Sequence, residues 1–373
     1  MADQGHAVSV VAPYDPAIQP DYSSSVNVHR FRYTWPKKWH IMGHARSLES
    51  DTRLKLGTYF LLPFFFLGAF IKLMQVTYQE KSELIHTHWV LPNGPAAVIT
   101  AKLRGIPLVI SLHGSDIYIA RKKRIFGLVA RWVFHHSSAI TACSPALRSA
   151  AIELGAQQSV QLITWGADPN IFHPKATSTK STGTKITVAS LGRMVPKKGF
   201  DQLILAWKDI IIEYPQSRLI VGGEGSQKAT LETLSARLGL ADSVTFPGRI
   251  PWDEVPDFLA MADIFVVPSI KDNEGNMDGL PTVIPEAMGC GLPIIASRLG
   301  GIPSIIKDKY NGILIPPGDV IALHNGIKYL LDHPTERKTL GAAAYSSIQN
   351  KYNWENITKE FLILFSQSLS LLK

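Results

Sequence analysis

The sequence predicts an α/β protein of two doubly wound domains that face a ligand-binding cleft, and three observations support this fold class. The 373 residues exceed the usual size of a single domain. Short apolar runs alternate with longer helical patterns, as in parallel strands joined by crossover helices. A stretch rich in Ser, Thr and Lys, from His173 to Thr184, separates the alternation into two series.

The two series of apolar runs place the elements. In the first series, helices are expected at 96–103 and 145–154, the latter begun by the capping hydroxyl of Ser144 and by Pro145. Strands are expected at 8–12, 84–87, 108–112 and 140–142, and then at 186–191, 218–221, 244–246, 264–267, 294–296 and 312–315. This gives a first domain at 1–173, a linker at 174–184 and a second domain at 185–350.

Composition narrows the class of protein without choosing a substrate. Hydrophobic residues make up 46% of the chain and charged residues 18%, which is typical of a globular protein. The formal net charge of +8 suits anionic substrates or an acidic membrane surface. Nucleic acid is not expected as a partner, because the basic residues are not interleaved with an aromatic stacking platform. The two cysteines are far apart and the first six residues are polar, so a cytoplasmic location without a signal peptide is expected.

One apolar run stands apart from the rest of the chain. Residues 56–71 carry no charge and include five phenylalanines, but about 20 apolar residues are needed to span a bilayer. We interpret the run as a buried or groove-lining helix, with peripheral contact at an anionic membrane as the alternative. Lys55, Lys72 and the basic cluster 121–124 would suit a lipid surface, although such charges commonly form a solvated face.

The stretch from Asp278 to Glu286 places two carboxylates eight positions apart around the sequence Gly-Leu-Pro-Thr-Val-Ile-Pro. Ionised carboxylates accept charge-assisted hydrogen bonds from hydroxyl groups, so the pair could bind a sugar nucleotide. Pro285 suits a first helical turn, which places Glu286 near a helix N-terminus. Taken alone, Glu286 could equally serve only as a partner of the helix dipole.

Two glycine-rich loops follow strands of the second series. Gly192 to Gly199 contains Arg193 and Lys198, whose charges suit a diphosphate, although a solvated basic turn is the alternative. Gly222 to Gly225 could bring backbone amides to a nucleotide. It has neither the Rossmann glycine spacing nor the Lys-Ser/Thr of a P-loop, which argues against ordinary dinucleotide and ATP sites.

Histidines end two strands of the first series. His113 follows residues 108–112 and could donate to a substrate hydroxyl or accept its proton, or be purely structural. His86, His88 and Trp89 end the preceding strand, where His88 and Trp89 could shape an acceptor site. No third ligand accompanies His86 and His88, so no metal is expected.

Taken together, these motifs resemble glycosyltransferase family 4 of the GT-B superfamily over nearly the whole chain, from about Gly5 to Phe365. The most specific parts are the basic glycine loop, the Gly-Gly-Glu-Gly loop, the run from Ala262 to Ser269, and the run from Asp278 to Pro293, in that order. The resemblance implies two Rossmann-like domains, a retaining reaction and no metal or other cofactor. It also implies that residues 351–373 form a last helix that packs back on the first domain.

The resemblance assigns roles to individual residues. Arg193 and Lys198 would hold the donor diphosphate, Glu286 the ribose hydroxyls, and His113 would lie beside the reacting sugar. Asp278 would contact the donor sugar together with the backbone that follows it. The implied catalytic residues are His113, Arg193, Lys198 and Asp278, and the implied donor-binding residues are Gly192, Arg193, Lys198, Gly222, Glu224, Asp278, Gly279, Leu280, Pro281, Thr282 and Glu286.

Two departures from the family pattern stand out. The first acid of the usual Glu-x7-Glu pair is Asp278, one methylene shorter, whereas Glu274 is out of register. The family's first strand and glycine-rich loop also have no counterpart before Gly5, so the sequence leads us to expect that both are lacking.

The sequence therefore predicts a retaining hexosyltransferase that uses a nucleoside diphosphate sugar and a glycan or lipid-linked acceptor in bacterial surface-glycan or exopolysaccharide synthesis. We expect it in the cytoplasm, with peripheral binding at the inner face of the membrane as an option. The alternatives are a sugar-nucleotide-binding protein without transferase activity, through the missing N-terminal unit, and a GT-B sugar-nucleotide epimerase.

Overall fold

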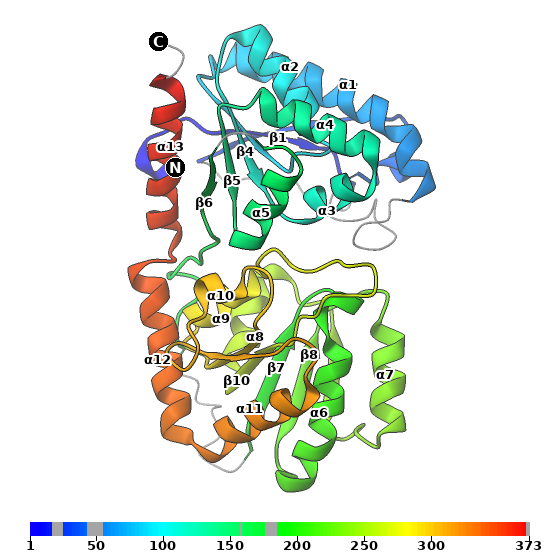
Figure 1. Ribbon diagram of the computed structural model, residues 1–373, viewed down its shortest axis with the longest axis vertical. Helices are drawn as coiled ribbons and strands as arrows, with labels where there is room; N and C mark the ends of the chain where they lie inside the picture. The colour runs from blue at the N-terminus through cyan, green and yellow to red at the C-terminus, as the bar shows by residue number, and fades with distance from the viewer. Residues whose placement is uncertain (17–24, 43–54, 157–158, 176–184, 371–373) are drawn as a thin grey trace. The chain divides into compact units, whose positions relative to one another are not determined.

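The computed structural model describes residues 1–16, 25–42, 55–156, 159–175 and 185–370. The chain forms two compact units, which we call the first unit (Met1–Ile163 with Thr358–Lys373) and the second unit (Thr164–Ile357). Both are built from parallel strands and helices (Figure 1). The predicted α/β class with two Rossmann-like units is therefore confirmed.

The first unit contains two parallel sheets. One pairs β1 with β2, and the other has the order β3-β4-β5-β6. Its elements are η1 (Ala2–Gln4), β1 (Ser9–Pro13), β2 (Asn27–Phe31), η2 (Lys37–Trp39), α1 (Leu56–Gln79), β3 (Ile85–His88), α2 (Gly94–Arg104), β4 (Leu108–Leu112), α3 (Ser115–Lys122), α4 (Arg124–His135), β5 (Ala139–Ala142), α5 (Pro145–Glu153) and β6 (Val160–Leu162).

The second unit has one parallel sheet of six strands in the order β12-β11-β10-β7-β8-β9. Its elements are β7 (Thr187–Leu191), η3 (Pro196–Lys198), α6 (Phe200–Glu213), β8 (Arg218–Gly222), α7 (Lys228–Arg237), β9 (Val244–Gly248), η4 (Trp252–Glu254), α8 (Val255–Ala260), β10 (Ile264–Val267), α9 (Val283–Gly289), β11 (Ile294–Ser297), α10 (Ile302–Ile305), β12 (Ile313–Ile315), α11 (Val320–Asp332) and α12 (Pro334–Asn350). Numbered within the unit, this is the order 3-2-1-4-5-6 of nucleotide-binding sheets.

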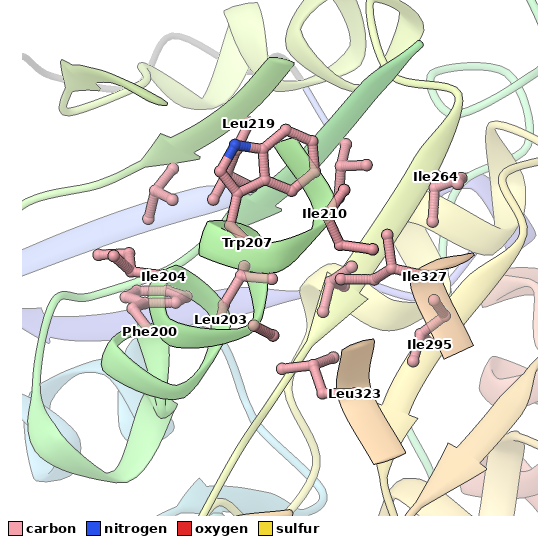
Figure 2. Packing of buried hydrophobic residues seen from close by; sticks show 14 of the residues in the cluster. Phe200, Leu203, Ile204, Trp207, Ile210, Leu219, Ile264, Ile295, Leu323 and Ile327 are labelled. Atoms are coloured by element: carbon pink, nitrogen blue, oxygen red, sulfur yellow. The ribbon is translucent and has the colours of Figure 1, made fainter. Parts of the chain in front are cut away.

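Apolar side chains between the sheet and α6 and α11 form the core of the second unit (Figure 2). Trp207 is its largest fully buried side chain, and its Nε1 donates a hydrogen bond to Ser243 Oγ at 3.2 Å. That bond satisfies the one polar atom of the indole, so the ring can pack at the centre of the core. Strand β10 is buried along its whole length, which explains why its sequence is a continuous apolar run rather than an alternating one.

The boundary between the units differs from the prediction of 1–173 for the first domain. Residues from Thr164 onward belong to the second unit. Ala167 N donates to Tyr352 O at 3.0 Å, and a Cβ on Gly166 would lie 2.6 Å from that same carbonyl oxygen. These backbone contacts tie 164–173 to the end of the second unit. Most of the predicted linker, 176–184, lies outside the described residues.

The last helix, α13 (Trp354–Ser370), belongs to the first unit from Thr358 onward. Its Phe361 and Phe365 rings pack 5.1 and 5.2 Å from the ring of His86 on β3, measured between ring centroids. The chain thus returns to the first unit from Thr358 onward, whereas residues 351–357, which the sequence assigned to the returning helix, belong to the second unit.

Candidate functional site

The site residues of the second unit gather where the order of its parallel strands reverses, between β7 and β10. β7 and β10 are hydrogen-bonded neighbours, but their crossovers lead to opposite sides of the sheet. Ligands of doubly wound sheets bind at such a switch point, beyond the carboxyl ends of the strands. The basic loop 192–199 follows β7, and the loop containing Asp278 follows β10. Ile270 N donates to Lys197 O at 2.8 Å, which joins the two loops.

A buried carboxylate between two lysines is the centre of this site. Lys198 Nζ lies 2.7 Å from Asp278 Oδ2, and Lys197 Nζ lies 3.1 Å from Asp278 Oδ1. Ser269 Oγ donates to Oδ2 at 3.4 Å. Burial opposes ionisation of Asp278, but the charges of Lys198 and Lys197 outweigh it and hold the pKa of the carboxyl well below its usual range. The three side chains therefore carry a net charge of about +1 at neutral pH.

The glycines of the two loops after β7 and β8 allow the loops to pack against each other. Gly223 has φ +132°, and a Cβ there would lie 1.9 Å from Gly192 O. Gly225 has φ +157°, and its Cβ would lie 2.3 Å from Met194 O. Met194 N donates to Glu224 O at 2.8 Å across the same contact. Glycine is thus required at these two positions because the two loop backbones lie too close together to leave room for a side chain.

Glu286 lies in the first turn of α9, as predicted, and its side chain is half-buried. Among the described residues its carboxylate has no hydrogen-bond or ion-pair partner. Burial raises the pKa of its carboxyl to about 7, although a helix N-terminus favours the ionised form. A half-buried carboxylate without a protein partner is free to accept hydrogen bonds from ligand hydroxyls.

The remaining predicted donor residues take different environments. Glu224 is exposed and pairs with Lys228 of α7 at 2.7 Å. Arg193 is exposed in the basic loop. The backbone from Gly279 to Pro281 is buried and leads into α9, with Thr282 exposed at its start. The structure thus brings Lys198 and Asp278 into direct contact and places Glu286 one helical turn beyond the same loop.

Sequence reasoning missed three contributors to this site. Lys197 is buried and binds the oxygen of Asp278 that Lys198 leaves unoccupied. Ser269 contacts the same carboxylate. Gly300, after β11, has φ +58°, and a Cβ there would lie 2.3 Å from Asp278 O. The Lys-Lys and Gly-Gly doublets were visible signals, but only the fold brings them to Asp278.

In the first unit, a line of polar side chains crosses β3, β4 and β5. His86 Nε2 lies 2.8 Å from Ser111 Oγ, which lies 2.7 Å from Thr141 Oγ1. At the strand ends, His88 Nδ1 lies 3.0 Å from His113 Nε2, so one of the two rings donates to the other. The predicted acceptor-side residues His88 and Trp89 therefore gather with His113.

Burial lowers the pKa of both His86 and His113 to about 3, with a further contribution from neighbouring histidines. Burial also lowers the pKa of His88. The three rings are therefore neutral at physiological pH. A neutral ring of such low basicity is a hydrogen-bond partner for a substrate hydroxyl and a poor proton acceptor. This favours the first of the two roles that the sequence left open for His113.

The loops that follow β3 and β4 are fixed by one buried carboxylate. Asp116 accepts hydrogen bonds from Val90 N and Gly114 N, both at 2.9 Å, and from His113 N at 3.3 Å. Burial raises the pKa of Asp116 against the effect of those amides. Trp89, the first residue after β3, has φ +70°, a strained value for a non-glycine residue.

No group of three or more His, Cys, Asp and Glu side chains that could hold a metal ion occurs within the described ranges. The functional side chains of the second unit are instead cations and carboxylates around a nucleotide-binding switch point. Together with the parallel sheets of both units, these features are typical of a two-domain α/β protein that binds a nucleotide.

Comparison with known families gives the particular family. Residues 174–347 match the family model described as glycosyl transferases group 1, and residues 1–164 match the glycosyl transferase 4-like domain. The chain belongs to this family of GT-B glycosyltransferases, and the protein is a glycosyltransferase enzyme.

Individual relatives agree with this assignment. A GDP-mannose-dependent monoacylated α-(1-6)-phosphatidylinositol monomannoside mannosyltransferase of Corynebacterium glutamicum is 31% identical over 218 residues, 56% of each chain. The match thus spans little more than half the length of that relative. Sucrose-phosphate synthase from Thermosynechococcus elongatus has the same fold, with a TM-score of 0.77 at 22% identity over 99% of this chain and 91% of that one. Anabaena HepE, solved with UDP-glucose, has a TM-score of 0.71 at 22% identity, over 96% and 99%.

Proposed function

We propose that this enzyme moves a hexose from a nucleoside diphosphate sugar to an acceptor hydroxyl and retains the anomeric configuration of the donor. The observation that carries the proposal is the contact of Lys198 and Lys197 with Asp278 at the switch point of the second unit. The named donors of similar proteins, GDP-mannose and UDP-glucose, support the donor class.

The charges of the second unit suit a diphosphate. Lys197, Lys198 and Asp278 together supply about one positive charge, and Arg193 in the same loop supplies another. A nucleoside diphosphate sugar carries two negative charges on its phosphates, which the cations of this loop would offset. Arg193 offers a planar fork of donors and Lys198 a compact charge, which stabilise the phosphate as its bond to the sugar breaks.

Glu286 completes the donor site as the acceptor for the ribose hydroxyls. Its carboxylate has no partner among the described residues, whereas each oxygen of Asp278 already accepts from a lysine. The carboxylates thus take separate tasks. Glu286 binds ribose, and Asp278 orients Lys198 while its remaining lone pairs face the donor sugar.

We propose front-face displacement for the chemical step. The bond between the anomeric carbon and the phosphate oxygen breaks as the acceptor oxygen bonds to that carbon from the same side. The departing phosphate takes the proton of the acceptor hydroxyl, which needs no basic side chain. Arg193 and Lys198 stabilise the charge that develops on the phosphate before the proton arrives.

We assign the acceptor side to His88, Trp89 and His113 of the first unit. The rings of His88 and His113 stay neutral, so they orient hydroxyl groups by hydrogen bonds and do not add charge. A glycan or lipid-linked acceptor in bacterial surface-glycan or exopolysaccharide synthesis fits this side. The named acceptor of the Corynebacterium relative, a phosphatidylinositol mannoside, supports a lipid-linked one.

We place this reaction in the cytoplasm. Cys143 and Cys290 are both buried and neither forms a disulfide, which suits a reducing compartment. No metal or organic cofactor is part of the proposed step, because the lysines and Arg193 supply the positive charge that the diphosphate requires.

Calorimetry and product analysis test this function together. The protein is titrated with GDP-mannose and UDP-glucose, and the preferred donor is then assayed for transfer, with NMR of the anomeric proton of the product. We expect binding, transfer and retained configuration, and a loss of turnover of about 100-fold or more in Arg193→Ala.

Matched variants separate the possible outcomes. Arg237→Ala, at an exposed arginine that ends α7, is the control and should keep full turnover. Donor binding without transfer to any acceptor would favour a sugar-nucleotide-binding protein. An inverted product, or undiminished turnover in Arg193→Ala, would contradict the mechanism.

A further inference from the structure

Helix α1 has two faces of the same apolar character but of opposite exposure. Phe65 and Ala69 point into the first unit and are buried, whereas Phe60 is 73% exposed and Phe64 is 59% exposed. The exposed side chains recur every three or four residues, so they form one stripe along about 22 Å of helix. This outer face of α1 consists of Leu56, Phe60, Phe64, Leu67 and Ile71.

The inner face of α1 holds the helix on the first unit. Phe65 packs against Phe31 of β2 and against Tyr33, with ring centroids 5.2 and 5.4 Å apart. A Cβ on Gly68 would lie 3.0 Å from Arg32 O, which brings the helix close to the chain after β2. By length and composition α1 is the one described helix that could cross a membrane. Its packing argues against a transmembrane role, because a membrane crossing would separate Phe65 from Phe31 and Tyr33.

A second apolar face lies beside the first. The Tyr59 ring of α1 stacks on the Phe126 ring of α4 at 6.4 Å, and α2 contacts both helices. In Figure 1 these three helices form one layer along the first unit. The outer face of α4 consists of Ile125, Leu128 and Trp132, which share one side of the helix and are all exposed. The predicted buried or groove-lining interpretation therefore holds only for the inner side of α1.

The positive charge of the chain is concentrated in the segment that contains these three helices. Residues 55–135 contain ten Lys and Arg and three Asp and Glu, a formal net charge of +7 out of +8 for the whole chain. Neither α1 nor α4 contains a carboxylate. Four consecutive basic residues, 121–124, are exposed where α3 ends and α4 begins, and Arg121 pairs with Glu153 of α5 at 2.9 Å. Apolar stripes on two helices that contain no acids, next to this basic cluster, complement an interface of acyl chains under anionic headgroups.

We propose that the outer faces of α1 and α4, with the basic cluster 121–124, bind the surface of an anionic membrane. The apolar side chains enter the boundary between headgroups and acyl chains, and the cations contact lipid phosphates. Charge complementarity favours a membrane over a second copy of the protein as the partner of this surface. Two copies that met through this layer would bring like charges together. The inference goes beyond the proposed function and does not rest on it.

Vesicle flotation with the full-length protein tests the proposal. The vesicles contain either phosphatidylcholine alone or equal parts of phosphatidylcholine and phosphatidylglycerol. We expect binding to the anionic vesicles, weaker binding in high salt, and little binding to the neutral ones. The double variant Phe60→Asp/Phe64→Asp should lower the partition coefficient about tenfold or more. Lys122→Glu/Lys123→Glu should weaken binding to the anionic vesicles alone.

Two controls make the result specific to this layer. Ile212→Asp/Ile321→Asp changes two side chains of the second unit that are each 73% exposed, as Phe60 is, and should leave vesicle binding unchanged. Circular dichroism confirms that each variant is folded. Donor binding, measured by calorimetry without vesicles, should be equal in all variants, so failure of this proposal is distinct from failure of the proposed function.

Three results would overturn the inference. The first is equal binding to neutral and anionic vesicles. The second is unchanged flotation of Phe60→Asp/Phe64→Asp. The third is sedimentation showing that this double variant converts a dimer into a monomer while vesicle binding stays the same, which would make a second copy of the chain the occupant.

Discussion

Lys198 Nζ contacts Asp278 Oδ2 at 2.7 Å, and the pair joins the loops that follow two neighbouring strands of the second unit. Lys198 comes after β7, whereas Asp278 comes after β10, so the contact spans the switch point of the sheet. With Lys197 on the other oxygen, Asp278 fixes the geometry of the cationic loop before any ligand arrives. Asp278, which the family resemblance assigns to the donor sugar, thus also positions the lysines that would bind the diphosphate.

Replacing Asp278 by Asn should destabilise the second unit, because two lysines that are largely buried would lose their counter-charge. We expect a loss of about 3 kcal/mol in the free energy of unfolding, measured by urea denaturation at pH 7. Asp257→Asn is the matched control, since Asp257 pairs with Lys175 at 2.6 Å on the surface. That change should cost less than about 1 kcal/mol. Equal costs for the two variants would contradict the organising role of Asp278.

Donor affinity should depend on pH through Glu286. Burial raises the pKa of its carboxyl to about 7, and hydrogen bonds from ribose hydroxyls require acceptors and favour the ionised form. Below pH 7 the donor must therefore displace a proton, and we expect affinity to fall by up to about tenfold per pH unit. Calorimetry between pH 5.5 and pH 8 in buffers of different ionisation enthalpy measures both the affinity and the released proton.

The variant Glu286→Gln should bind the donor more weakly at pH 8 and should lose this pH dependence. Glu224→Gln changes an exposed carboxylate that is paired with Lys228, so its pH profile should follow the parent protein. A profile in Glu286→Gln that keeps the same slope would assign the titration to another group.

The glycine loops predict a difference between two Gly→Ala variants. Gly223→Ala should destabilise the second unit by more than about 2 kcal/mol, because φ is +132° and the new Cβ would lie 1.9 Å from Gly192 O. Gly239→Ala is the control. Its φ of +72° is also left-handed, but no atom lies within 4 Å, so about 1 kcal/mol is expected. Thermal unfolding of the two variants gives the comparison, and similar values would mean that the loops separate at little cost.

The first unit should lose stability in acid because of its buried histidines. The pKa of His86 is lowered to about 3 in the folded protein, against about 6.5 in the unfolded chain. Only the unfolded state binds the proton between these values, so stability is full above pH 6.5 and falls as pH drops toward 3. We expect His86 to contribute a loss of about 2 kcal/mol between pH 7 and pH 5.

Hydrogen exchange of the β3 and β4 amides at both pH values measures that loss within the first unit. His86→Gln should reduce the difference between pH 7 and pH 5, and His6→Gln, at an exposed position, should not. Glu286 acts with the opposite sign in the second unit. Its raised pKa lowers stability as pH rises from 4.5 to 7, so the amides must be assigned to each unit separately. An unchanged pH difference in His86→Gln would place the acid sensitivity elsewhere.

The strands that sequence reasoning placed correctly share one property. Leu108–Leu112 and Ile264–Val267 were predicted at their observed bounds, because strands buried on both faces are mostly apolar runs, broken here only by Ser111. The helix start at Ser144 was also readable, and its Oγ accepts from Leu147 N at 3.2 Å. Two strands were missed, β2 and β6. Asn27–Phe31 mixes polar and apolar residues, and Val160–Leu162 is too short to show a period.

The sequence predicted most residues of the candidate site but not the contacts between them. The basic loop, the glycine loop and the two acids were all identified from residue type and spacing. Two contacts depend on which strands are neighbours. Asp278 lies between Lys197 and Lys198, and Gly223 packs against the backbone of Gly192. Likewise, the run 56–71 indicated a helix, but its two faces became distinct only when Phe31 and Tyr33 covered one of them.

The sequence by itself determined the alternation of strands and helices, the family, and the carboxylates and cations available for a sugar nucleotide. These features are local, because they depend on residue type and on spacing within one segment. Only the tertiary structure decided the pairing of Lys198 with Asp278, the absence of a described partner for Glu286 and the exposure of the outer face of α1. Each of these depends on contacts between residues far apart in the chain, which a strand order of 3-2-1-4-5-6 creates and no local pattern encodes.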